Sequence, residues 1–394
     1  MAGKSNARRE YGSGSVSQRS DGTWTARFVI GTNDNGKPKV KAFYGKSERE
    51  VRRKLNDFKK EFYKNGSTAV QKVTVKQFMS KWFAENKRNS LKPKSFDRLE
   101  QTLEYQVYPT IGHLQIGSLQ SDDVQAMVNK LKDDGYSYST VKKAYDAVND
   151  CFRTAVIQHT VVFNPALGVT IPAKKLFGTA QIRYHEEAAV KKICDAAMSV
   201  YSNGKRVYRL GDAIILDLNT GLRLAELASL KWDDIDFENK VLFVTSTRVI
   251  VKDRTPDALH KYITLEQDSG KSENSEREVT LNDEAISALE RLKEITGQYQ
   301  YVLSTRDGAA ISLRYLDRLY RKIEVAAGLP EEQIYGMHSL RHTFATTLFT
   351  NGVDIKTISE LLGHSDIAIT YNTYVHIIKK LKRDAVYSIN KAHV

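Results

Sequence analysis

Basic, imidazole and phenolic side chains gather in one stretch of the sequence, residues 338–374. Its chemistry-bearing residues are His338, Arg341, His342, His364, Tyr371 and Tyr374. An arginine guanidinium offers a planar fork of donors to two phosphate oxygens. A histidine can hold or pass a proton near neutral pH. A tyrosine can be a covalent nucleophile if its neighbours help it to lose its proton. The combination predicts chemistry on a phosphate ester.

Four short boxes carry a family resemblance. They are Gly221-Leu222-Arg223-Leu-Ala-Glu226, His338-x-x-Arg341-His342-Thr-Phe-Ala, Leu362-Gly363-His364-Ser365 and Thr373-Tyr374-Val-His376. One box alone is a weak signal, but four in this order at these separations are a specific one. The chain resembles the tyrosine recombinases, the phage-integrase family, and most closely the integrases of temperate phages and conjugative transposons. The resemblance covers nearly the whole chain.

The resemblance implies an enzyme that recombines DNA at specific sites and integrates and excises a mobile genetic element. Such enzymes cut and rejoin DNA through a 3′-phosphotyrosine intermediate, and they need no ATP, metal or other cofactor. Two alternatives remain open. A type IB topoisomerase shares the active-site logic but acts as a monomer, and a catalytically silent DNA-binding protein could share the fold.

The resemblance also assigns the phosphate-binding side chains. Arg223 and Arg341 grip the two non-bridging oxygens, and His364 donates a hydrogen bond to a phosphate oxygen. His338 is the general base. Glu226 lies one helical turn after Arg223, so its carboxylate is placed to orient that guanidinium.

The nucleophile and the general acid are harder to assign. Tyr371 and Tyr374 are three residues apart, so they share one face of a helix and periodicity cannot choose between them. The family's spacing selects Tyr374 as the nucleophile and leaves Tyr371 as a packing residue. By the same resemblance, Lys271 is the hairpin lysine that protonates the leaving 5′ oxygen.

A metal site is not expected. His338 and His342 have the His-x-x-x-His spacing that can bind zinc on a helix. However, no glutamate follows the first histidine, and the cationic Arg341 would lie beside the metal. We therefore interpret His342 as a structural residue.

These residues require a scaffold, which the sequence divides into parts. The pattern predicts a multidomain α+β protein. An arm-type DNA-binding domain (1–66) has a three-stranded sheet and one helix, and an all-helical core-binding domain (73–165) follows. An extended linker (166–181) leads to a mainly helical catalytic domain (182–394) with a β-sheet and hairpin, a partly β-like insertion at 249–265 and an amphipathic tail helix.

The charge of the chain also indicates DNA as the partner. The chain has 60 Lys+Arg and 47 Asp+Glu, a net charge of +13, and residues 1–64 carry 16 of these cations against 7 of the anions. A basic front module is typical of a nucleic-acid surface. The candidate DNA contacts are Arg27, Lys39 and Lys41 in the front module and Lys92, Lys94 and Arg98 in the helical domain.

The expected partner is double-stranded DNA, as element ends and as a target site. The resemblance implies a homo-tetramer on DNA, with an excision factor and a host DNA-bending protein as further partners. Only two cysteines occur, so a disulfide framework is not expected and a reducing cytoplasm fits. No apolar run is long enough to cross a bilayer, so no membrane is expected. The predicted location is the bacterial cytoplasm, on DNA.

Overall fold

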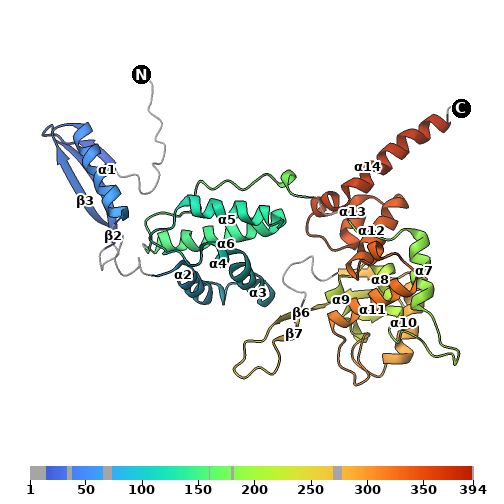
Figure 1. Cartoon of the computed structure of the whole chain (residues 1–394). Helices are drawn as coiled ribbons and strands as arrows, with labels where there is room; N and C mark the ends of the chain where they lie inside the picture. The colour runs from blue at the N-terminus through green and yellow to red at the C-terminus, as the bar shows by residue number, and fades with distance from the viewer. Residues whose placement is uncertain are drawn as a thin grey trace. The chain divides into compact units, whose positions relative to one another are not determined.

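The computed structural model describes residues 15–32, 38–64, 73–158, 160–178, 182–268 and 277–392. The chain divides into two compact units, Met1–Thr179 and Ala180–Val394. The first holds a small sheet with one helix and a separate helical block, and the second holds all four boxes (Figure 1). Within the described ranges, no helix has the length and apolar character needed to cross a membrane.

The front module is an antiparallel sheet of β1 (Ser15–Gln18), β2 (Trp24–Thr32) and β3 (Pro38–Gly45), and α1 (Glu48–Lys64) lies across it (Figure 1). Alternation along β2 places Ala26 and Phe28 on one face, where they are buried against Val51 and Leu55 of α1. The module therefore has a small hydrophobic core of its own.

The helical block contains α2 (Val75–Trp82), α3 (Pro93–Thr102), α4 (Tyr108–Ile111), α5 (Ser121–Asp133) and α6 (Tyr138–Ile157). Thr74 and Gln77 form the capping box that opens α2. The predicted linker differs from the structure, because Ala166 and Phe177 are buried in the core of this block. Apolar side chains at both ends of this stretch, Ala166 and Phe177, hold it on the helices.

The second unit is mainly helical. Its helices are α7 (Glu187–Ala197), α8 (Asp212–Thr220), α9 (Leu224–Leu227), α10 (Asp283–Thr296), α11 (Leu313–Ala326), α12 (His338–Thr350), α13 (Ile355–Leu361) and α14 (Ile367–Ala392). Helix α8 is buried on nearly all sides and packs against α7, α10 and α12. A smaller core joins α12, α13 and α14 around Phe349, Leu362 and Tyr374.

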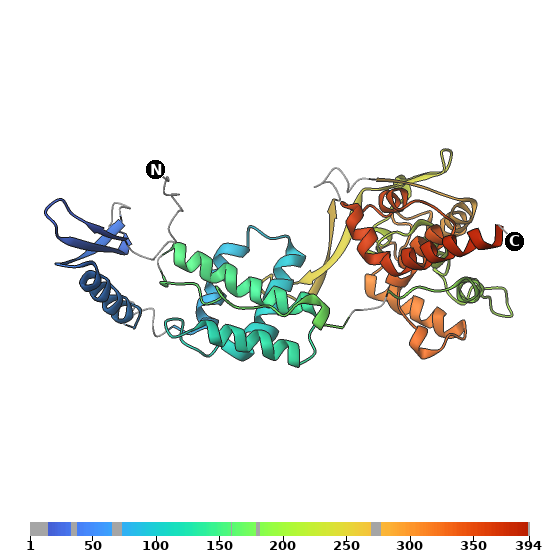
Figure 2. The ribbon, with the colours of Figure 1, turned by 90° about the horizontal axis from the view of Figure 1, so that it is seen from above.

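The strands of this unit form two antiparallel sheets. One contains β4 (Ile235–Asp236), β5 (Val241–Val244) and β8 (Arg277–Thr280), and the other pairs β6 (Ser246–Lys252) with β7 (Tyr262–Asp268). The extended stretch 241–252 is divided at Thr245 between the two sheets. The insertion at 249–265 is part of the β6–β7 hairpin, which projects from the body of the unit (Figures 1 and 2).

Helix α14 contains the predicted tail helix. It starts at Ile367, and its backbone leaves helical geometry at Tyr374, with φ −105° and ψ 17°. Beyond this kink, Ile377 and Ile378 pack on the unit's own smaller core. Further along the helix, the side chains of Leu381, Ala385 and Ile389 lie outside the described set.

Candidate active site

Two arginines from different boxes donate hydrogen bonds to backbone carbonyls of the other boxes. The Arg223 guanidinium donates to the carbonyl of Gly363 at 2.8 Å. That of Arg341 donates to the carbonyls of Gly221 at 2.7 Å and Leu362 at 2.5 Å. Because three boxes share these bonds, the guanidinium groups are held at fixed positions relative to each other.

Two glycines at these contacts have backbone geometry that other residues adopt at a cost. Gly221 ends α8 with φ +61°, and a side chain there would collide with the ring of Phe344. Gly363 has φ +60°, and an added Cβ would lie 2.8 Å from Cδ of Arg277. The glycines therefore permit the close approach that brings both carbonyls to the arginines.

Glu226 is the anion that organises the arginines. Its carboxylate accepts a hydrogen bond from the Arg223 guanidinium at 2.6 Å and one from the Arg223 backbone N–H at 2.9 Å. Arg277 adds a two-pronged contact at 2.8 and 3.1 Å. Burial would raise the pKa of Glu226, but the bonds and charge of Arg277, with Arg223, lower the pKa to about 2. The carboxylate is therefore ionised at neutral pH.

His364 uses both ring nitrogens inside the protein. Its Nε2 lies 3.0 Å from Nη2 of Arg341, and its Nδ1 lies 2.7 Å from the Thr370 hydroxyl. A guanidinium has only donors, so Nε2 accepts and Nδ1 carries the proton. Burial, with Arg341 and Arg223, lowers the pKa of His364 to about 4. Its expected donation to a phosphate oxygen stays a prediction, since in this arrangement Nε2 is an acceptor.

His338 and His342 lie one turn apart at the start of α12. Their rings meet edge to face with centroids 4.6 Å apart. The His338 side chain is exposed, but it still loses part of its hydration to the protein around it. This partial desolvation, together with the charges of Arg341 and Arg223, lowers the pKa of His338 from its usual value. Among the described residues, no third metal-binding side chain joins this pair.

The two tyrosines have opposite environments. Tyr374 is 1% exposed, and its hydroxyl lies 2.8 Å from Nδ1 of His342. Burial raises the pKa of Tyr374 above its usual value, and the charge of Arg341 opposes that rise. Tyr371 is 44% exposed, so its interpretation as a packing residue was wrong. The kink at Tyr374 and its core packing turn its ring inward, whereas Tyr371 remains on the outer face.

Lys271 lies outside the described residues, between β7 and β8. The structure therefore does not place the expected general acid. It does place Arg277, the first residue of β8, at the centre of the arginine–glutamate cluster.

Sequence reasoning missed two residues of this site. No local signal marked Arg277, because its contact with Glu226 joins residues far apart in the chain. His342 was interpreted as structural, although its position one turn after His338 and next to Arg341 placed it in the site. The other expected side chains, Arg223, Glu226, His338, Arg341, His364 and Tyr374, lie in one connected cluster.

The candidate DNA contacts of the front module do not share one face. Lys41 is paired with Phe28, and its ammonium lies 4.3 Å from the centroid of the Phe58 ring on the helix side. Arg27 is exposed on the opposite face of the sheet. The side chain of Lys39 is outside the described set, so the three residues stay a prediction.

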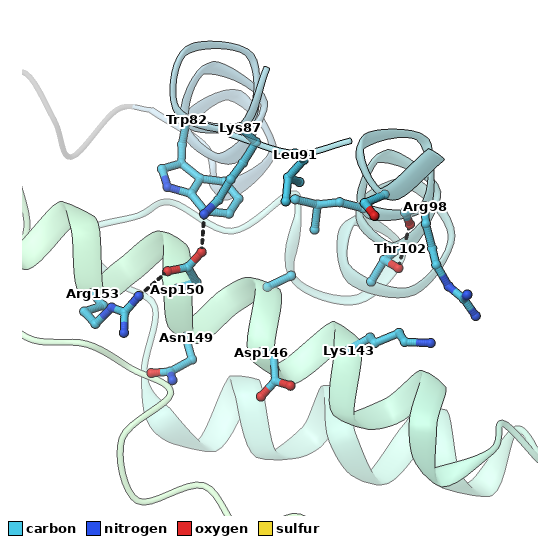
Figure 3. A pocket seen from close by; sticks show the side chains of 13 residues that line it. Trp82, Lys87, Leu91, Arg98, Thr102, Lys143, Asp146, Asn149, Asp150 and Arg153 are labelled. Carbon is cyan, nitrogen blue, oxygen red and sulfur yellow. Dashed lines mark hydrogen bonds and ion pairs between the residues drawn. The ribbon is translucent and has the colours of Figure 1, made fainter. Parts of the chain in front are cut away.

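The candidate contacts of the helical block lie at the start of α3, where Lys92, Lys94 and Arg98 are exposed. Arg98 borders a groove of about 550 Å³ between α3 and α6, and Lys143 extends along its other side (Figure 3). Asp150 also lines the groove and forms ion pairs with the cationic side chains of Lys87 and Arg153. The basic side chains of Arg98 and Lys143 along the groove are compatible with phosphate contacts, and these contacts stay a prediction.

Comparison with known proteins agrees with this geometry. Residues 184–380 match the model of the phage integrase family, and residues 75–170 match that of the phage integrase central domain. A tyrosine recombinase XerC-like protein of Caldanaerobacter subterraneus subsp. tengcongensis is 34% identical, over 92% of this chain and 94% of its own length. The transposase from transposon Tn916 of Enterococcus faecalis is 23% identical, over 83% of this chain and 80% of its own.

Solved structures show the same fold. The Tn1549 transposon integrase in complex with transposon right end DNA matches with a TM-score of 0.59 and 24% identity, over 77% of this chain and 95% of its own. A lambda integrase tetramer bound to a Holliday junction matches with a TM-score of 0.56 and 17% identity, over 93% and 96%. With two matching family models and a relative similar over nearly its whole length, this chain belongs to the phage integrase family of tyrosine recombinases, enzymes that cut and rejoin DNA.

Proposed function

We propose that this recombinase integrates and excises a mobile element, and that Tyr374 is its nucleophile. Arg223 and Arg341 grip the scissile phosphate, His338 accepts the tyrosine proton, and Lys271 supplies a proton to the leaving group. The arginines supply fixed positive charge where negative charge develops on the phosphate.

The bond changes balance without a cofactor. The Tyr374 oxygen forms a bond to phosphorus and gives up its proton, while the bond from phosphorus to the 5′ oxygen breaks and that oxygen gains a proton. The products are a 3′-phosphotyrosine and a free 5′ hydroxyl. A 5′ hydroxyl from a second duplex then attacks the link and restores tyrosine. Each step exchanges one phosphate ester for another, so no ATP is consumed.

The observation that carries this proposal is that hydrogen bonds between the boxes hold their functional side chains in fixed positions. The two guanidinium groups, the His364 ring and the Tyr374 hydroxyl are brought together by the turn before α9, helix α12, the turn between α13 and α14, and the kink of α14. Preorganised cations beside a tyrosine hydroxyl form a site for a phosphodiester rather than for a carbonyl.

The proposed partner is double-stranded DNA, as the ends of an element and its target site. We propose a homo-tetramer as the active assembly, supported by the lambda integrase tetramer solved on a Holliday junction. An excision factor and a host DNA-bending protein are further proposed partners. The proposed location is the bacterial cytoplasm, where the DNA substrate lies.

The test uses duplexes that carry candidate element ends with a nick near the cleavage site, so that the cut strand diffuses away. Wild-type protein should leave a covalent protein–DNA band on a denaturing gel. Tyr374→Phe should bind DNA and give no band, and the matched control Tyr371→Phe should still give it.

A band from Tyr374→Phe would contradict the nucleophile assignment. Joining of two duplexes at a defined sequence separates recombination from both alternatives. A topoisomerase would relax supercoiled DNA without joining duplexes, and a silent DNA-binding protein would form no band.

A further inference from the structure

Among the described residues, the side chain that hydrogen-bonds the Tyr374 hydroxyl is His342 rather than the expected base. Nδ1 of His342 lies 2.8 Å from the Tyr374 oxygen, and the two rings meet at 69° with centroids 5.7 Å apart. His338 reaches this pair only through an edge contact with the His342 ring. The first neighbour of the nucleophilic oxygen is therefore a residue outside the expected catalytic set.

The direction of this bond follows from the protonation of His342. Burial, with His338, Arg341 and His364, lowers the pKa of His342 to about 4, so the ring is neutral near pH 7. A phenol is a stronger acid than a neutral imidazole N–H, so the favoured bond has the tyrosine donating to Nδ1. The proton of His342 is then on Nε2.

The backbone alone does not fix this hydroxyl. Tyr374 lies at the kink of α14, where the φ and ψ angles are not helical. Its ring packs on Phe349, with centroids 5.4 Å apart, and this contact limits tilting of the ring. The bond to His342 holds the far end of the side chain, which carries the reacting atom.

The position of His342 in the chain gives the bond a catalytic consequence. His342 directly follows Arg341, whose guanidinium is fixed to the carbonyls of Gly221 and Leu362. A hydroxyl bonded to His342 is thus fixed relative to the group proposed to grip the phosphate. A displacement of about 1 Å at a reacting atom can cost a factor of about 100 in rate.

We propose that His342 is a positioning residue, which holds the Tyr374 oxygen in line for attack by accepting the hydrogen bond of its hydroxyl. The inference rests on the proposed role of Tyr374. The bond to His342 holds the oxygen until the attack, when the hydroxyl proton leaves this bond and passes to His338. His338 thus remains the proposed base, and His342 aims the atom that attacks.

Two amide substitutions distinguish this role from simple packing. In His342→Asn the side-chain amide occupies nearly the position of Nδ1, so the bond to the hydroxyl can form. In His342→Gln the amide lies one bond further out, near the position of Nε2. His342→Leu removes the bond and keeps an apolar side chain.

The nicked duplexes with candidate element ends provide the rate of covalent adduct formation at saturating protein, and gel shift provides the affinity. We expect unchanged affinity in all variants. We expect adduct formation slower by about tenfold or more in the Leu and Gln variants, and within about threefold of wild type in the Asn variant. Wild type and Tyr374→Phe on the same gel test the proposed nucleophile separately.

A second measurement needs no DNA. The ¹³Cζ resonance of Tyr374, identified by its loss in Tyr374→Phe, should stay near its wild-type position in the Asn variant and move in the Leu and Gln variants. Melting temperatures are measured alongside, and if the Leu variant does not fold, the Asn and Gln pair decides. Equal rates in Asn and Gln, a Leu variant as fast as wild type, or a faster Leu variant would each overturn the proposal.

Discussion

Replacing Arg277 with methionine should destabilise the second unit by about 3 kcal/mol. Arg277 and Glu226 are both nearly excluded from solvent, with side chains 9% and 4% exposed. The pKa of Glu226 falls from 4.5 to about 2, a difference of about 2.5, which corresponds to about 3.4 kcal/mol at about 1.36 kcal/mol per unit. Breaking a buried ion pair by removing one partner costs about 3–5 kcal/mol, in the same range. Arg223 also contributes, so we take the lower figure.

Scanning calorimetry of the full chain measures this prediction. A domain of about 200 residues loses about 2–4 °C in melting temperature per kcal/mol, so the transition of the second unit should fall by about 6–12 °C. The matched control is Lys240→Met, which removes an exposed ion pair with Asp283 and should leave the transition unchanged. An Arg277→Met variant that melts like the wild type would refute the reasoning.

The stability lost in Arg277→Met should depend on pH in a definite direction. The pKa of Glu226 is lower in the folded state, so its ion pairs stabilise the fold above the unfolded value of 4.5, and this contribution disappears as pH falls toward about 2. The difference in melting temperature between wild type and Arg277→Met should be constant above about pH 5 and narrow progressively below it. A difference that widened at acid pH would contradict this assignment.

Three further predictions concern other parts of the chain. Deleting residues 1–64 should weaken binding to distal arm sites and flatten its salt dependence, while cleavage of a core site survives; unchanged affinity for full-length ends would count against a DNA-binding front module. Lys271→Ala should slow cleavage of normal DNA and recover close to the wild-type rate when the 5′ bridging oxygen is sulfur, since a thiolate leaves without a proton; equal defects on both substrates would remove the general-acid role. Gly221→Ala should lower the melting temperature of the second unit and slow adduct formation, because its φ of +61° and the Phe344 ring exclude a side chain; normal melting and cleavage would show that the loop adapts.

Local patterns predicted much of the scaffold. Alternation along β2 places Ala26 and Phe28 on the buried face, and the Thr74–Gln77 capping box opens α2. Both signals depend on neighbours within a few residues, so the sequence carries them directly. The packing of Phe177 on the helical block was not predicted, because it depends on a partner surface distant in the chain.

The sequence by itself determined the chemistry-bearing residue types and their order: two arginine boxes, the histidines and a tyrosine near the end. Tertiary structure alone decided which of these groups touch. Arg277 binds Glu226, and Arg223 and Arg341 bind backbone carbonyls of other boxes. The kink at Tyr374 turns this tyrosine inward to His342, while Tyr371 stays exposed. The physical reason is that spacing along a helix fixes only neighbours three or four residues apart, whereas these contacts join segments that meet when α8, α12 and α14 pack together.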